Sequence, residues 1–542
     1  MENKRLEVVF SKDSRKGPES GQVVIYAEHF GVEKNQIFRF RCRFSDDRDE
    51  VGGSLYLGLM PSIIYKDKNR DSGHLDSVML FEGLFSSSSK ERTRFFTLLP
   101  DMEEYRKIVR VCGPKKAQLL LASINDMVIH KSIKTDWFDE AVESDIFKLR
   151  ILLRSGSFYA FHNAESLLSG LINEDISGIS KSILLKFQLD GFKNEHKIEL
   201  KYESDSIIPK RINVLIGKNG VGKSQALTKF SRLALQMTNE QGTLKDTDSR
   251  DGRPMINRMI AIATPGETIN TFPGERVNQQ KIFYRRLSFA RGSRAKQSRG
   301  ITETLIQLSR NDESVKGKNR WNFFWDAIST CLPVESIGIV NKSGYFTPLH
   351  DFEVLDDSES TARFISEFDR NAEPKFRGES SISPLSSGQL TFFKFALQCS
   401  LYIENGSFVL MDEPETHLHP NMISDFVAML DSLLEATGSQ ALIATHSAYF
   451  VREVSREQVH IVRVDNEGYV DIAESRLRTF GADVESISQF VFMEDIESKL
   501  TDKIYQRLKG AKFESVEKSL SDELSLAALM DIRTRLGLEE GF

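Results

Sequence analysis

Apolar and polar residues follow different periods along this chain of 542 residues. At 37–44, apolar side chains alternate with arginines, which predicts a strand with one buried face. A helical period follows near 115–150, and the aromatic segment 155–161 is predicted to pack in a core rather than to line a pocket. Residues 1–178 show no catalytic spacing, and we interpret them as a mixed α/β accessory domain.

The pattern changes after this first domain. Two alternating segments, 183–189 and 196–202, predict an antiparallel pair of strands joined by a turn that contains Gly191. The pair leads to 212–216, where four of the five residues are apolar, as is typical of a strand buried on both faces. We predict that these strands begin a second domain, which spans 179–490.

A long insertion is predicted within the second domain, at 236–380. We predict in it a strand at 258–264, a helix rich in tryptophan and phenylalanine around 321–325, and a polar span near 340–381 with glycine and serine. Three or four heptads with apolar a and d positions would indicate a coiled coil, and the insertion has none. A long coiled coil is therefore excluded.

A glycine-rich segment, 217–224, follows the apolar strand and fits the pattern G-x-x-x-x-G-K-[ST]. In this pattern the glycines let backbone N–H groups turn toward phosphate oxygens, the lysine reaches the β- and γ-phosphates, and the hydroxyl ligates Mg²⁺. The helix that begins there also points its positive end at the phosphates. The predicted ATP-binding residues of this segment are Gly217, Asn219, Gly220, Gly222, Lys223 and Ser224, and Ser224 is also a predicted magnesium ligand.

A second motif, Leu-Ser-Ser-Gly-Gln at 385–389, comes directly before an apolar-rich helix predicted at 390–397. Ser387 and Gly388 would lie at the N-terminus of that helix, where a hydroxyl and backbone N–H groups can face an anion. Ser-Gly pairs occur in loops of many kinds, but here a strand ending in two acids follows closely. We predict that Ser387, Gly388 and Gln389 contact nucleotide.

The strand predicted at 407–413 ends in Asp412 and Glu413. We predict that Asp412 holds Mg²⁺ through water and that Glu413 orients or deprotonates the attacking water. Adjacent acids are often only a solvated turn, but four apolar residues precede this pair. A later strand at 440–447 presents His446 at its C-terminal end, where a histidine can sense the γ-phosphate. Glu413 and His446 are the predicted catalytic residues.

Other candidate metal ligands are weaker. His417 and His419 form an H-x-H pair without a third ligand nearby, so we expect structural and dimer-contact roles for them. The cysteines lack C-x-x-C spacing, which argues against a disulfide framework or a zinc site. The four cysteines are Cys42, Cys112, Cys331 and Cys399.

The formal net charge of −6 creates no overall field that would attract nucleic acid. Residues 281–300 are a local exception, with seven basic and no acidic side chains beside three aromatic residues. One interpretation is a contact surface for the nucleic-acid backbone, and the other is a solvated basic loop. The sequence does not separate them.

The two ends of the chain carry different signals. The first residues lack the apolar core of a signal peptide, and no apolar run approaches the ~18 residues of a membrane span, so we expect a cytoplasmic protein without membrane contact. Residues 491–542 show helical apolar spacing between 496 and 520. We predict a helical tail that packs on the second domain, with a partner-docking helix as the alternative.

The order of these motifs resembles ABC-type (AAA15/AAA21-like) ATPases of prokaryotic anti-phage defence systems, over residues 183–490. Within that group the chain looks most like the Septu and retron-associated ATPases, and more distantly like the overcoming-lysogenization-defect (OLD) family. The matching blocks are 215–227, 412–420 and 479–488. The resemblance implies an α/β fold, with an ABC-type (SMC/OLD-like) P-loop ATPase head between the accessory domain and the helical tail.

The resemblance also implies partners. Such ATPases assemble as dimers or larger complexes around ATP and control an associated nuclease, often of the HNH type. In an ABC head, the signature loop cannot reach the phosphates of its own P-loop, so Ser387 would complete the site of a second subunit. The chain departs from the family in two ways: residues 1–178 match no known domain, and no clear Q-loop glutamine is present, although Gln279 and Gln280 are candidates.

Three functions follow as hypotheses. The leading one is an ATPase that regulates a separately encoded effector nuclease in phage defence. The second is a DNA-binding repair or structural ATPase of the SMC-like class without a long coiled coil, which would use 281–300. In the third, the N-terminal domain senses a phage protein or nucleic acid. A built-in nuclease is not predicted, because 464–467 lacks the carboxylate pattern of the OLD-type Toprim nuclease.

Overall fold

The computed structural model divides into two compact units, Met1–Phe480 and Gly481–Phe542. The residues that it describes are 5–11, 13–27, 37–44, 50–60, 95–152, 154–168, 179–204, 206–208, 210–237, 240–249, 252–263, 271–274, 282–288, 300–311, 314–315, 318–353, 359–492, 506–508, 513–520, 524, 529–530, 532–534 and 536.

The N-terminal part of the first unit contains a five-stranded sheet in the order β1-β2-β3-β4-β5. Strands β1 and β2 are parallel, and the other neighbours are antiparallel. Phe38, Phe40 and Cys42 alternate into the core, which agrees with the strand predicted at 37–44. The strands are β1 Glu7–Ser11, β2 Gln22–Ala27, β3 Ile37–Arg43, β4 Glu50–Leu59 and β5 Phe95–Leu98.

Helices of the N-terminal part pack against one another and against β4 and β5. The first of them starts at Met102, where the Asp101 side chain accepts a hydrogen bond from the backbone N–H of Glu104 and caps the helix. Its backbone is not helical at Gly113, where φ is 76°, and a second helical segment follows this kink, close to the start predicted near 115. The segment 155–161 lies in a helix with Phe158 buried, which agrees with the predicted core role. The helices are α3 Met102–Ser123, α4 Met127–Ile133, α5 Phe138–Glu143, a π-helical turn Phe147–Ile151 and α6 Ser155–Leu168.

The rest of the first unit is built on a seven-stranded sheet in the order β11-β10-β18-β19-β8-β20-β21. All neighbours in it are parallel except β20 and β21. Strands β8, β18 and β19 are buried along their whole length, which explains why apolar residues dominate their sequences. The strands are β8 Ile212–Ile216, β10 Arg258–Ala263, β11 Phe283–Ser288, β18 Ser407–Asp412, β19 Gln440–Thr445, β20 Val459–Val464 and β21 Val470–Glu474.

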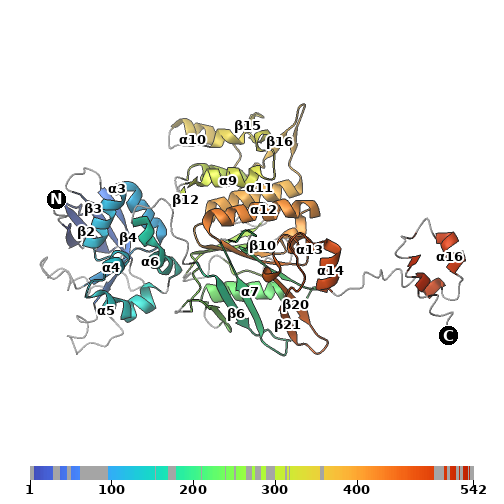
Figure 1. Cartoon of the computed structure of the whole chain (residues 1–542). Helices are drawn as coiled ribbons and strands as arrows, with labels where there is room; N and C mark the ends of the chain where they lie inside the picture. Colours follow the sequence, from blue (N-terminus) through green and yellow to red (C-terminus); the bar gives the residue numbers. More distant parts are fainter. Residues whose placement is uncertain are drawn as a thin grey trace. The chain divides into compact units, whose positions relative to one another are not determined.

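Both faces of this sheet are covered. Figure 1 shows α11 and α12 on one side and α7 with β6 on the other. Phe230 of α7 stacks on Phe408 of β18 at a centroid distance of 4.6 Å. The predicted antiparallel pair is present as β6 and β7, in a three-stranded sheet with β9. The elements are β6 Ser182–Phe187, β7 His196–Lys201, β9 Thr243–Asp246, α7 Lys223–Ala234, α11 Ser387–Tyr402, α12 Pro420–Thr437 and α13 Ala448–Val451.

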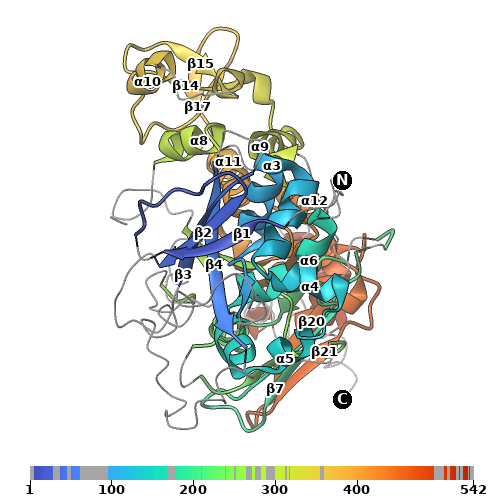
Figure 2. The same cartoon turned by 90° about the vertical axis from the view of Figure 1, so that its left-hand side faces the viewer.

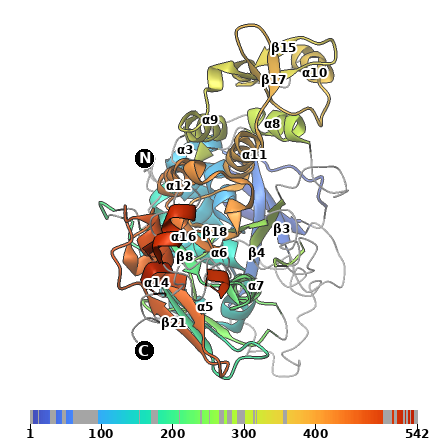
Figure 3. The ribbon, with the colours of Figure 1, turned by 90° about the vertical axis from the view of Figure 1, so that its right-hand side faces the viewer.

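The insertion contains more regular structure than its polar composition predicts. Residues 337–384, which contain the polar span near 340–381, form a four-stranded antiparallel sheet in the order β15-β14-β16-β17. Figures 2 and 3 show this small sheet beyond α8 and α9, and α9 packs on α11 and α12. The elements are α8 Ile301–Ser309, β12 Ser314–Val315, β13 Lys318–Asn319, α9 Arg320–Ser329, β14 Ile337–Val340, β15 Phe346–Pro348, α10 Glu359–Ser366, β16 Lys375–Arg377 and β17 Ile382–Pro384, with 3-10 turns at Val334–Ser336, Leu349–Phe352, Pro414–His417 and Arg456–Gln458.

The basic segment 281–300 is described only in part. Its first half forms β11, beside β10 in the large sheet. The Arg285 guanidinium lies 5.4 Å from the Phe283 ring centroid and 5.1 Å from that of Tyr402, so this side chain supports the fold. Lys281 and the basic residues from 291 onward lie outside the described residues, as do Gln279 and Gln280. The nucleic-acid surface therefore stays a prediction.

The second unit, Gly481–Phe542, contains α14 Val484–Phe492 and α16 Phe513–Leu520. Val516 packs with Ile532 and Leu536 within this unit. Positions 496, 500 and 504 of the predicted apolar stripe lie outside the described residues. Within the described ranges, no helix combines the length and apolar character that crossing a membrane requires.

Candidate nucleotide site

The glycine-rich loop between β8 and α7 depends on its glycines for its shape. Gly220 and Gly222 have φ angles of 81° and 94°, which residues with a Cβ rarely adopt. Gly217 approaches the sheet so closely that an added Cβ would lie 2.3 Å from the carbonyl oxygen of Val462. A larger residue at any of these three positions would strain or displace the loop.

Lys223, the first residue of α7, is buried with its ammonium group inside the loop. Its Nζ donates hydrogen bonds to the carbonyl oxygens of Gly217 at 2.8 Å and Lys218 at 3.0 Å. Burial lowers the pKa of Lys223, and nearby carboxylates oppose this change. Asn219 and Gly220 are exposed at the tip of the loop. This combination of a cation and a glycine-rich turn suits polyphosphate.

The predicted magnesium ligands lie together at the C-terminal end of β18. The Ser224 hydroxyl donates to Oδ1 of Asp412 at 2.9 Å, and the Thr271 hydroxyl donates to Oδ2 at 2.8 Å. Burial raises the pKa of Asp412, while these two hydrogen bonds lower it. Thr271 was not predicted, because it lies in the insertion without a local motif.

These residues fit a magnesium site. Mg²⁺ prefers hard oxygen ligands and in nucleotide sites takes few of them from the protein, because water and phosphate supply the rest. Ser224 and Asp412 offer such oxygens next to the phosphate-binding loop. The described residues contain no group of three or more His, Cys, Asp and Glu side chains that could hold a metal without such help.

The predicted catalytic residues lie close together at the ends of neighbouring strands. Glu413 follows β18 in the left-handed region, with φ 47°, which is uncommon for a residue other than glycine. Its backbone N–H donates to the carbonyl oxygen of Ala444 at 2.8 Å, which fixes it beside β19. Nδ1 of His446 lies 3.5 Å from Oε1 of Glu413. This conformation aims a carboxylate and an imidazole at the same region.

A further acid, Glu415, supports His446. Its Oε1 accepts hydrogen bonds from the Thr445 hydroxyl at 2.5 Å and from the backbone N–H of His446 at 3.0 Å. The same oxygen lies 3.2 Å from Nδ1 of His446. The sequence analysis did not select Glu415, although its place in the Asp-Glu-Pro-Glu run was a usable signal.

Replacing Glu415 by glutamine should change how stability depends on pH. Burial raises the pKa of Glu415, so its ionisation costs folding free energy: the stability that the protonated group contributes is present below the unfolded pKa and is lost as the pH rises through the folded pKa. Glutamine keeps an acceptor and cannot ionise. Relative to the wild type, the melting temperature of Glu415→Gln should rise by roughly 1–3 °C between pH 4.5 and pH 8.

Differential scanning fluorimetry across that pH range measures this difference. Glu415→Ala is the control, because it removes the oxygen that accepts the hydrogen bond of the buried Thr445 hydroxyl. The loss of this acceptor should lower the melting temperature at every pH. A pH-independent difference between Glu415→Gln and the wild type would contradict the role of ionisation.

The Leu-Ser-Ser-Gly-Gln motif at 385–389, called the signature segment from here on, forms a capping box at the start of α11. The Ser386 hydroxyl accepts a hydrogen bond from the N–H of Gln389 at 3.3 Å, and the Gln389 side chain accepts one from the N–H of Ser386 at 2.9 Å. Gln389 thus has a structural role that the prediction of a nucleotide contact did not include. The Ser387 side chain is exposed, and Gly388 is buried. A substitution at Ser387 leaves the cap intact.

The histidine pair after Glu413 serves the local fold in part. Nδ1 of His419 accepts a hydrogen bond from the N–H of Asn421 at 3.4 Å and caps α12. This agrees with the structural role predicted for His419. The side chain of His417 is outside the described residues.

Residues 341–452 match the family described as "AAA domain, putative AbiEii toxin, Type IV TA system". The matched range contains the signature segment, the acid pair and His446, and it excludes the glycine-rich loop. The glycine-rich loop, the acid pair and His446 follow the strands β8, β18 and β19 of the mostly parallel sheet. The fold class is α/β, as the sequence predicts.

Further similarities are to individual proteins. Protein ea59 of Escherichia phage lambda is 23% identical over 489 residues, which cover 86% of this chain and 85% of that protein. The SmcHead bound to the C-winged helix domain of ScpA has a TM-score of 0.31 and 12% identity, covering 55% of this chain and 98% of its own. The SMC head domain from Thermotoga maritima has a TM-score of 0.28 and 14% identity, covering 55% and 99%. Because these scores are low, the ATPase assignment rests on the geometry of the motifs.

Proposed function

We propose that this protein hydrolyses ATP between two copies of its head and thereby regulates a separately encoded effector nuclease in phage defence. The observation that carries the ATPase proposal is the joining of Ser224 to Asp412, beside the pair formed by Glu413 and His446. A solvated acidic turn would not connect the phosphate-binding loop to the strand that carries the acids.

The residues divide the chemistry among themselves. Bound Mg²⁺ supplies positive charge that neutralises the phosphates, and Ser224 and Asp412 would hold it. Lys223 would exchange its two carbonyl partners for phosphate oxygens. Oε1 of Glu413 would orient the attacking water and accept its proton, and His446 would hold that carboxylate while facing the γ-phosphate.

The second subunit would contribute its signature segment to the nucleotide site. Ser387 is exposed at the N-terminus of α11, where its hydroxyl and the helix dipole favour an anion from another molecule. Two copies related by a twofold axis would each place Ser387 over the partner's nucleotide. ATP would then hold the two heads together, and hydrolysis would weaken their association.

The role in defence is supported by similarity. The matching family is described as "AAA domain, putative AbiEii toxin, Type IV TA system", and protein ea59 comes from Escherichia phage lambda. The motif blocks resemble Septu and retron-associated ATPases, which control nucleases. A change of assembly driven by ATP can regulate a cell only through an effector activity. We propose that this effector is a partner nuclease, with the HNH type as the first candidate.

The experiment that tests this function combines mass and activity. The protein should be purified alone and together with a nuclease encoded beside it, and its mass measured by light scattering with ATP, with ADP and without nucleotide. We expect ATP to raise the mass and to change the activity of the nuclease. Unchanged mass together with absent ATP turnover would refute the ATPase proposal, whereas ATP-dependent assembly without an effect on any neighbouring nuclease would refute only the proposed output.

A further inference from the structure

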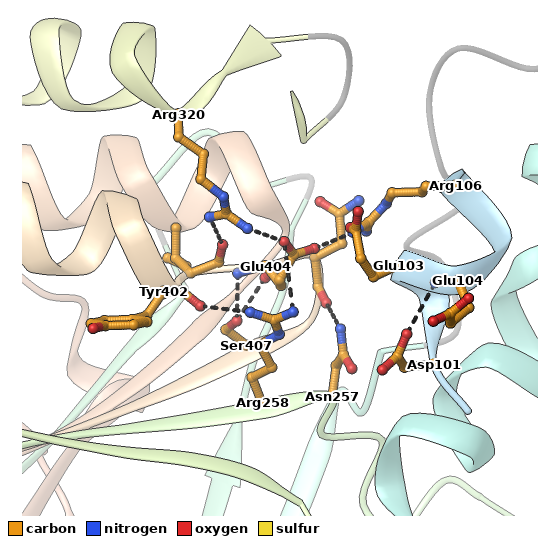
Figure 4. A network of polar contacts seen from close by, with 12 residues as sticks. Asp101, Glu103, Glu104, Arg106, Asn257, Arg258, Arg320, Tyr402, Glu404 and Ser407 are labelled. Carbon is orange, nitrogen blue, oxygen red and sulfur yellow. Dashed lines mark hydrogen bonds and ion pairs between the residues drawn. The ribbon is translucent and has the colours of Figure 1, made fainter. Parts of the chain in front are cut away.

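The turn between α11 and β18 contains a buried carboxylate surrounded by three arginines. The Glu404 side chain is 1% exposed, and its Oε2 accepts a hydrogen bond from Nη1 of Arg106 at 2.5 Å. Its Oε1 pairs with Arg320 and lies 4.0 Å from Nη2 of Arg258. Figure 4 shows that these side chains converge from four elements: α3, α9, β10 and the turn itself.

This arrangement keeps a charge in the interior of the protein. Burial alone raises the pKa of Glu404, but Arg106, Arg258 and Arg320 outweigh it and hold the pKa below its ordinary value. A buried carboxylate that stays ionised needs partners that replace its lost hydration. Because Arg258 and Arg320 remain when Arg106 is removed, loss of Arg106 weakens the cluster without leaving the carboxylate unpaired.

The same cluster fixes the C-terminal end of α11. Arg320 donates to the carbonyl oxygens of Ser400 at 3.0 Å and Ile403 at 2.8 Å, and Arg258 donates to that of Tyr402 at 3.4 Å. The last carbonyls of a helix lack partners within it, and cations at this end are favourable. Since α11 is one continuous helix of 16 residues, a shift at this end also moves the end that carries the signature segment.

The N-terminal part of the chain contacts the head at this turn. Arg106 belongs to α3, and a second contact comes from α6, where the Tyr159 ring packs against Gly406 so tightly that an added Cβ would lie 2.6 Å from it. In a third contact, the Arg253 guanidinium lies 4.4 Å from the centroid of the Phe158 ring. The turn continues directly into β18, which ends at the predicted magnesium ligand.

We propose that Arg106 is a positioning residue: through Glu404, the N-terminal part sets the position of α11 and thereby controls how well Ser387 completes the site of a partner subunit. This inference rests on the proposed sharing of ATP between two heads. It gives the N-terminal part a route to the nucleotide site that does not pass through the phosphate-binding loop. A molecule bound to this part would therefore change assembly without changing the affinity of one subunit for ATP.

The test compares Arg106→Ala with Arg110→Ala in the full chain. Arg110 lies one turn further along α3, is 45% exposed, and pairs with Glu103 at 3.8 Å rather than with Glu404. In Arg106→Ala without nucleotide, we expect amide hydrogen exchange at 386–392 to increase at least about fivefold, the lower end of typical couplings between sites. Arg110→Ala should exchange like the wild type.

A second experiment measures self-association and nucleotide affinity. In Arg106→Ala, ATP-dependent self-association should weaken at least about fivefold, while the affinity of the single subunit for a fluorescent ATP analogue stays within about twofold of the wild type. Arg106→Lys should recover part of both effects, because an ammonium can pair with Glu404 but cannot form the fork of a guanidinium.

The inference would be overturned if Arg106→Ala and Arg110→Ala showed the same amide hydrogen exchange at 386–392 and the same self-association. If Arg106→Ala does not fold, Arg106→Lys takes its place, with faster exchange than the wild type expected and wild-type exchange contradicting the role. If the wild type does not assemble with ATP, the proposed function fails, but the exchange comparison still tests the coupling because it needs no nucleotide.

Discussion

Replacing Glu413 by glutamine should reduce the rate of ATP turnover by about 100-fold or more, the usual effect of losing a general base. Glutamine has nearly the same shape and keeps an oxygen beside His446, but it cannot accept the proton of the attacking water. Because Ser224, Asp412 and Lys223 are unchanged, ATP should still bind. Steady-state hydrolysis and equilibrium binding of ATP measure the two effects separately.

The same variant should accumulate in the ATP-bound assembly, because the step that loosens it is slowed. Glu435→Gln is a matched control, since Glu435 lies on α12 with a side chain that is 66% exposed and that pairs with Arg211 away from the nucleotide site. Turnover like that of the wild type in Glu413→Gln would show that another group activates the water. Loss of ATP binding would show instead that the substitution disturbs the loop.

Mixing two inactive variants should restore ATP hydrolysis if each site uses residues of both subunits. Lys223→Ala removes the phosphate-binding cation, and Ser387→Arg places a bulky cation on the surface that covers the partner's nucleotide. In a mixed dimer, the intact loop of the Ser387→Arg subunit meets the intact signature segment of the Lys223→Ala subunit. Random pairing in a twofold dimer would then recover about a quarter of wild-type turnover.

Each variant alone should be reduced at least about 100-fold in turnover, because it lacks a group that stabilises the transition state. Ser432→Arg is the control for the added charge, since Ser432 is another exposed serine, on α12, and this variant should keep wild-type turnover. Activity of Ser387→Arg alone would place the signature segment outside the site. A mixture that stays inactive, although co-purification of differently tagged subunits shows mixed dimers, would argue against shared sites.

The central strands and the nucleotide motifs could be predicted because their signals are local. A strand buried on both faces consists mainly of apolar residues, and β8 and β18 show this pattern in sequence and in structure. The turn after β8 needs glycine wherever φ is positive, as at Gly220 and Gly222. Such requirements act within a few residues, so short motifs record them.

Side chains that contact each other from distant parts of the chain show no comparable pattern in the sequence. The Thr271 hydroxyl reaches Asp412 from 141 positions away, and Arg106 reaches Glu404 from 298 positions away. In each case a threonine or an arginine in sequence looks like many others, because its role comes from the carboxylate that folding places beside it. The small sheet in the insertion was missed for a related reason, since its short strands are paired mainly with one another and carry many exposed residues.

The chain's own order of residues was thus enough to establish the α/β class, the phosphate-binding loop and the acids at the end of β18, since backbone geometry and short-range chemistry restrict these positions strongly. Long-range packing established that Glu415 supports His446 and that Glu404 connects α3, α9 and β10 to the end of α11. Burial makes these contacts strong, because a carboxylate removed from water must find its donors within the folded protein.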